Sequence, residues 1–293
     1  MMDYKYTELD YAKKIYENGF QSEQHKPTEL RLVATYMRRI LDYKPKKLRE
    51  EMYQWCEIHI PDYKRELYYK MINSAINKAC KKGSMLINID QILFYQYEMD
   101  YINNLFIKED ADTQKESVYS YACKKLLFTL LFKMKANKLL SESKSIDKDF
   151  AYTGKYFKGG QKKYTELKRL AKLPEKVRIN EDIIHTLWIN DLVSPMHNGL
   201  IKLNFMEKLY ELQDNKKEND NTISLEIKEY DSVGLYFDYY NKDKKVSFCK
   251  ECGKIFKKRS NRQEYCSTEC SKIIDREKAK KRMQVKRESK CSI

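Results

Sequence analysis

The chain has 293 residues, a formal net charge of +15, and only 8 Gly and 5 Pro. So few turn-forming residues exclude a β-sandwich or barrel with many tight turns, and an apolar fraction of 42% excludes a largely disordered chain. We therefore expect a fold that is mainly α, with small α+β parts.

The amino-terminal sequence has no apolar stretch of signal-peptide length, and the longest obvious apolar run of the chain is Leu126 to Phe132. We expect a cytoplasmic protein with no membrane partner. In a reducing compartment its 8 cysteines are thiols or metal ligands rather than disulfides. Cys56, Cys80 and Cys123 occur singly within helical patterns, where inert thiols are expected.

Four helices are expected at the amino-terminal end, because apolar side chains recur there every three or four residues. The first runs from Thr7 to Asn18, and the others cover residues 27–42, 45–58 and 61–83. A short strand at 85–89, a helix around 98–106 and an acidic linker at 109–112 follow. This helical body, residues 1–110, is the first expected domain.

A second domain, residues 111–241, is expected to open with a helix over about 114–140 whose wide apolar face includes Val118. After a loop at 141–160 come two helices, the second at 179–193 with Trp188 on its apolar side, and a strand from Ile201 to Phe205. This order resembles a winged helix-turn-helix, in which Ile223 to Ile227 would form the partner strand of the wing across the polar loop 213–222. A generic α+β lobe is the alternative.

The second helix of this lobe, residues 179–193, contains no Lys or Arg but carries Glu181, Asp182 and Asp191. Three carboxylates facing the phosphates of a DNA groove would oppose binding, so we expect no base readout by this helix. Residues 155–178 carry a charge of +7. If the lobe contacts DNA, this basic segment does so through the backbone; otherwise the lobe is a dimerisation or packing module.

The most specific motif lies in the last domain, residues 242–293: Cys249-x-x-Cys252-Gly253, then Cys266-x-x-x-Cys270. Two closely spaced thiolate pairs can complete a tetrahedron around one Zn²⁺ ion, and Gly253 gives the backbone freedom for the first pair. Ser267 can cap a helix that places Cys270 in its first turn. Four thiolates leave no coordination position for a catalytic water, which makes the zinc structural.

The stretch Phe248 to Phe256, followed by Tyr265-Cys-Ser-Thr-Glu-Cys270 and a basic helix, resembles a small treble-clef finger. Similar fingers end uncharacterised phage and mobile-element proteins of Gram-positive bacteria, and they are distantly similar to CGNR-type fingers, although Cys270-Ser-Lys-Ile stands here in place of Cys-Gly-Asn-Arg. The helical body from Thr28 to Gly83 and the segment from Asp231 to Tyr240 also look like that group. The resemblance implies a protein associated with nucleic acid.

Residues 242–293 carry a charge of +11, which suits a phosphate-binding surface. The expected contacts are Lys254, Lys257, Lys258, Arg259, Arg262, Lys272, Arg276, Lys280, Lys281 and Arg282. The sequence thus predicts a zinc-containing accessory or regulatory protein that binds nucleic acid, with DNA favoured over RNA.

The alternative is an adaptor that uses the finger and the basic tail on an acidic protein partner. A protein partner or a homodimer is also considered. A metal-dependent nuclease is less favoured, because His25, His59, His185 and His197 lack metal-ligand spacing. No phosphate loop or nucleophile motif is visible either, so neither an enzyme nor a small-molecule substrate is expected.

Overall fold

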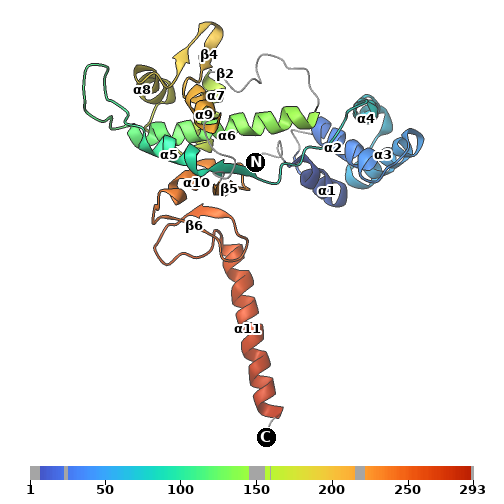
Figure 1. Ribbon diagram of the computed structural model, residues 1–293. Helices are drawn as coiled ribbons and strands as arrows, with labels where there is room; N and C mark the ends of the chain where they lie inside the picture. Colours follow the sequence, from blue (N-terminus) through green and yellow to red (C-terminus); the bar gives the residue numbers. More distant parts are fainter. Residues whose placement is uncertain (1–6, 23–25, 145–155, 159, 215–221, 292–293) are drawn as a thin grey trace. The chain divides into compact units, whose positions relative to one another are not determined.

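The computed structural model describes residues 7–22, 26–144, 156–158, 160–214 and 222–291. This part of the chain is mainly helical with small antiparallel sheets, as the composition predicts (Figure 1). It divides into two compact units, residues 1–90 with 134–154 and residues 91–133 with 155–293. The three domains expected from the sequence stay a prediction, because compactness does not show which segments fold alone. Within the described residues, no helix is long and apolar enough to cross a bilayer.

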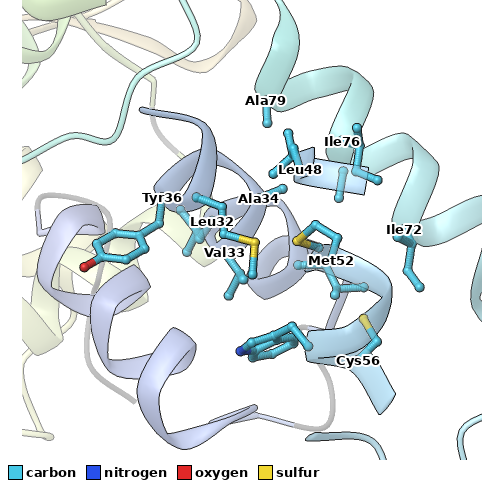
Figure 2. Packing of buried hydrophobic residues seen from close by; sticks show 14 of the residues in the cluster. Leu32, Val33, Ala34, Tyr36, Leu48, Met52, Cys56, Ile72, Ile76 and Ala79 are labelled. Carbon is cyan, nitrogen blue, oxygen red and sulfur yellow. The ribbon is translucent and has the colours of Figure 1, made fainter. Parts of the chain in front are cut away.

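Four helices form the first unit: α1 (Glu8–Asn18), α2 (Lys26–Arg39), α3 (Pro45–His59) and α4 (Arg65–Cys80). α2 packs against the other three, and it is buried from Leu30 to Met37 apart from Arg31, because a helix surrounded by others needs apolar side chains on most of its circumference. Figure 2 shows the shared core, with Met52 and Cys56 of α3 and Ile72 and Ile76 of α4. Leu67, in the first turn of α4, is 73% exposed and lies outside this core.

The strand expected at 85–89 is wrong. Burial does alternate there, with Ile87 and Ile89 buried, but the described chain has a single isolated β-bridge in this segment, between Asn88 and Thr7. The strand is β1 (Ile92–Tyr95), which leads into α5 (Gln96–Asn104). Alternation shows that a segment is extended, whereas pairing depends on a partner elsewhere in the chain.

The second unit has an aromatic core around the first half of α6 (Ser120–Lys144). Phe128 of α6 contacts Phe94 of β1 and Phe237 of α10 (Val233–Tyr240), with ring centroids 4.4 and 5.3 Å apart. The expected apolar face of this helix is confirmed from Cys123 to Met134, all of whose predicted members are buried. Val118 was expected on that face, but it precedes the helix and is 77% exposed.

A three-stranded antiparallel sheet with the order β2-β4-β3 forms a lobe of the second unit. It contains β2 (Tyr156–Lys158), β3 (Ser194–Pro195) and β4 (Leu200–Lys202), and α7 (Gln161–Leu170), a π-helical turn η3 (Ile179–Ile184) and α8 (His185–Ile189) connect β2 to β3. The expected loop at 141–160 therefore contains β2, although 145–155 and 159 lie outside the described residues. The expected order of helix, helix and strand is present, and the identification as a winged helix stays a prediction.

The partner of β5 (Ile223–Ile227) differs from the one expected. β5 pairs antiparallel with β1, where Phe94 faces Leu225 across the ladder, and not with β4 of the lobe. β3 and β4 are instead joined by the short 3-10 turn η4 (His197–Gly199). α9 (Phe205–Asp214), which was not expected, begins at a residue assigned to the strand. Of the loop expected at 213–222, residues 215–221 lie outside the described part.

Candidate metal centre and basic surface

A two-stranded hairpin places the first two cysteines. β6 (Val246–Phe248) pairs antiparallel with β7 (Ile255–Lys257), and Cys249 and Cys252 lie in the turn between them. The amide of Cys249 donates to the carbonyl of Lys254 at 2.8 Å, and the amide of Gly253 donates to the carbonyl of Cys249 at 3.0 Å. Gly253 has a φ of +70°, a left-handed conformation that glycine adopts without steric cost. The expected role of Gly253 is confirmed.

The other two cysteines lie at the start of α11 (Thr268–Cys291). Cys266 precedes the helix and Cys270 lies in its first turn, where the amide of Cys270 donates to the Oγ of Ser267 at 3.3 Å. The expected helix cap is therefore present. It orients the first turn so that the Sγ atoms of Cys266 and Cys270 are 3.7 Å apart.

All four Sγ atoms lie within 4.8 Å of one another, and those of Cys252 and Cys266 are 3.5 Å apart. Four sulfurs around a zinc ion at about 2.3 Å are separated by roughly 3.8 Å in a regular tetrahedron. The donor set and its spacing therefore fit a metal ion such as zinc. Among the described residues, this is the one cluster of at least three His, Cys, Asp or Glu side chains close enough to share an ion.

The thiols of this cluster differ in acidity. Burial opposes ionisation of Cys249, but amides of Cys252, Cys266 and Glu251 donate to its sulfur and lower its pKa to about 6. Burial and the neighbouring thiols raise the pKa of Cys266 to about 12. Cys249 therefore ionises more easily than Cys266, whose proton a bound metal would have to displace.

Aromatic and apolar side chains hold the hairpin against α10. Val246, Ile255 and Phe256 are buried, and Phe248 makes an edge-to-face contact with Tyr239 of α10, with ring centroids 4.8 Å apart. Tyr239 therefore packs on the first strand of the finger. Tyr240 instead turns toward α5, where its hydroxyl accepts a hydrogen bond from Gln96 Nε2 at 3.0 Å.

The ten expected phosphate contacts lie on the hairpin, on the loop after it and on α11. All are exposed except Lys258, which is half-buried. Within the described chain none of the ten forms an ion pair, whereas Lys250 of the same finger pairs with Glu264 at 2.5 Å. The described side chains of α11 form no apolar stripe, and Ile273 is 41% and Met283 59% exposed. The structure therefore leaves these ten cations accessible and does not test what they bind.

Three of the nine cations in the other basic segment, residues 155–178, form ion pairs. Lys163 contacts Glu166 at 3.5 Å, Arg169 contacts Asp231 at 3.2 Å, and Arg178 contacts both Glu181 and Asp182. Arg178 lies directly before the acidic helix 179–193, and its ion pairs partly neutralise the charge of two of the three carboxylates of that helix. This segment offers fewer free cations than its composition predicts.

Trp188 of α8 was expected to be buried, but it is 54% exposed. The π-helical turn η3 precedes α8, and its wider turn moves the buried face to Thr186 and Leu187. Asn190, which follows α8, forms two hydrogen bonds with the backbone of Lys108, at 2.8 and 3.0 Å. Asn190 therefore has a structural role.

The histidines do not join the four-cysteine cluster within the described residues. His59 packs on Trp55 and His185 on Trp188, with ring centroids 4.6 and 5.9 Å apart, while His197 begins the turn η4. His25 lies outside the described residues. These three histidines therefore have packing or turn roles.

Comparisons of this chain with protein-family models, with curated proteins and with solved structures gave no match. The resemblance to mobile-element proteins therefore depends on the sequence motifs alone, among which the four-cysteine finger is the specific one.

Proposed function

We propose that the protein binds nucleic acid, in the first place DNA, through phosphate contacts of its carboxy-terminal finger and α11. The observation that carries this proposal is the set of ten accessible cations without ion pairs, on the hairpin, the loop and the helix beside the four cysteines. Exposed cations spaced along a helix can follow a phosphate backbone and release its counterions.

Zinc is the metal that we propose for the cluster, and its role there is structural. Four thiolates fill the tetrahedron, so the ion would have no open position at which to activate water. The bound ion would fix Cys249 and Cys252 of the hairpin relative to the start of α11. It would also reduce the positive charge of the finger by about 2, because four thiolates outweigh one Zn²⁺. The remaining charge still suffices for several phosphate contacts.

We further propose a non-enzymatic accessory or regulatory role, of the kind found in phage and mobile-element proteins. The resemblance of the finger supports it, as does the absence of a free metal position. In this proposal the lobe around β2, β3 and β4 has a winged-helix arrangement and serves in packing or dimerisation. The ion pairs of Arg169 and Arg178 support that use, because they occupy cations that backbone contacts would need.

A salt titration tests the proposal. Fluorescence anisotropy of a labelled duplex should show log affinity falling against log salt concentration with a slope of about −4 to −5, if about five phosphates are contacted. Changing Lys280, Lys281 and Arg282 together to Ala should reduce that slope by up to about 3 and weaken all sequences equally. Changing the exposed Lys46, Lys78 and Lys82 of the first unit to Ala removes the same charge and should leave the slope unchanged.

Binding to DNA that is weak and nearly independent of salt would refute the proposal. The adaptor alternative would then gain support if an acidic protein partner bound the finger. Equal effects of the two triple changes would show that net charge acts on binding without a localised contact surface.

A further inference from the structure

Two aromatic rings beside the metal cluster remain open to solvent although they contact each other. Tyr239 is 45% and Phe248 36% exposed, because an edge-to-face contact covers only part of each ring. The preceding residues of α10, Tyr236 and Phe237, are buried at 3% and 0%. The exposed pair therefore forms an aromatic surface at the edge of a packed core.

A groove of about 400 Å³ adjoins this surface. It lies between the end of α10 and strand β5, and its lining includes Ser224, Leu225, Tyr239, Tyr240, Lys242 and Asp243. Tyr240 is held in place by Gln96, whose Oε1 accepts a hydrogen bond from Ser224. In the described part of the chain, the Tyr239 hydroxyl has no hydrogen-bond partner, so its ring is held by packing alone.

The turn after α10 carries three lysines, of which Lys242 lines the groove. Lys242, Lys244 and Lys245 are exposed, and among the described residues none of them forms an ion pair. Lys242 has a φ of +61°, and its amide donates to the carbonyl of Tyr239 at 2.9 Å, which closes the turn after α10. Asp243 is the acidic lining residue. Its Oδ1 accepts a hydrogen bond from the amide of Lys245 at 2.9 Å.

We propose that this groove binds an unpaired base of single-stranded nucleic acid, which stacks on Tyr239 while the three lysines contact the flanking phosphates. Exposed aromatic rings among cations are the usual means of binding single strands. In a duplex the bases are stacked on one another, and their faces are not available to a side chain. The free carboxylate oxygen of Asp243 can accept a hydrogen bond from an exocyclic amino group of a base.

This inference rests on the proposed function and adds the strand state of the ligand. The ten cations of the finger and α11 would contact either form of nucleic acid through phosphates. Stacking of a base on Tyr239 would add affinity for the single-stranded form alone. The two contributions are therefore separable by changing one side chain.

Anisotropy titrations of the full-length, zinc-loaded protein test this separation with three probes: a twenty-nucleotide oligothymidine, an oligouridine of the same length and a twenty-base-pair duplex. Tyr239→Ala should weaken binding of the single strands about tenfold and leave the duplex within about twofold, because loss of one stacked base affects only unpaired ligands. Tyr239→Phe keeps the ring and should bind as the unchanged protein does. Tyr210→Ala is the matched control, because Tyr210 is 39% exposed on α9 and outside the groove. The two single-stranded probes show whether the groove prefers DNA or RNA.

A crosslinking experiment on the unchanged protein covers the case in which Tyr239→Ala disturbs folding. Irradiation with an iodouracil-substituted single strand should yield a crosslinked peptide that contains Tyr239 or Phe248. If the protein binds both forms with a steep salt dependence but Tyr239→Ala leaves their affinity ratio unchanged, or crosslinks form only on α11, this inference is wrong and the proposed function stands. If neither form binds, both are wrong.

Discussion

Replacing Asp238 with Ala is expected to destabilise the second unit by about 3–5 kcal/mol, because it leaves a buried cation without its partner. Lys125 Nζ of α6 lies 2.6 Å from Asp238 Oδ2, and the two side chains are 7% and 8% exposed. The hydroxyl of Tyr121 donates to Asp238 Oδ1 at 2.8 Å. Without this carboxylate, Lys125 retains only the carbonyl of Lys172, at 3.5 Å. Burial already lowers the pKa of Lys125, although Asp238 opposes that shift.

The loss can be measured by urea unfolding followed by circular dichroism, with hydrogen exchange of α6 and α10 peptides to localise it. Glu211→Ala is the control: it breaks the Lys208–Glu211 pair, which has a similar length of 2.8 Å but side chains that are 59% and 61% exposed. It should cost less than about 1 kcal/mol. Replacing both buried partners, as Lys125→Met with Asp238→Leu, should recover most of the loss. If Asp238→Ala costs no more than Glu211→Ala, water reaches the buried pair and the reasoning is wrong.

Two further predictions concern the metal ligands of the finger and the close packing of α10. Cys252→Ser removes one of the four sulfur ligands, so elemental analysis should show less zinc. Hydrogen exchange should show a less protected hairpin, while α1 to α4 exchange as before. Full zinc content would contradict this prediction. Gly234→Ala should cost about 3 kcal/mol or more in urea unfolding, since the added Cβ would lie 2.0 Å from the Ala171 carbonyl oxygen. Gly83→Ala is the control, because Gly83 has a φ of +79° but no heavy atom within 4 Å of the added Cβ, and it should cost only about 1–2 kcal/mol. Equal losses of unfolding free energy for the two variants would show that α10 can shift to relieve the clash.

The metal cluster was predictable from sequence because its chemistry is local. Each feature that identifies the two cysteine pairs spans at most four residues. These features are the spacing within each pair, the glycine after Cys252 and the serine before the helix. The structure places Gly253 in the left-handed conformation and Ser267 as the cap of Cys270. Helices of the first unit were predictable for the same reason, since an apolar period of three to four residues is a property of one segment.

Pairing partners and the phase of short helices were not predictable, because each depends on distant or irregular structure. The alternation in β5 identifies a strand, but it cannot show that Leu225 faces Phe94 from far earlier in the chain. The periodicity around Trp188 was interpreted as an α-helix, and one π-helical turn was enough to place that side chain in solvent. The exposure of an aromatic side chain could not be predicted for the same reason, because it depends on contacts with distant segments.

The segment from Gly234 to Tyr239 shows how one short helix can serve both the core and the surface. Successive residues of a helix point about 100° apart, so Asp238 can face Lys125 in the interior while Tyr239, the next residue, reaches Phe248 and the groove. Gly234 lets the same helix approach the backbone of Ala171. The buried ion pair therefore fixes the rotation of α10 about its axis, and that rotation decides how much of the Tyr239 ring faces solvent. A change at Asp238 should for this reason alter single-strand binding as well as stability, whereas a change at the half-exposed Tyr239 should alter binding more than stability.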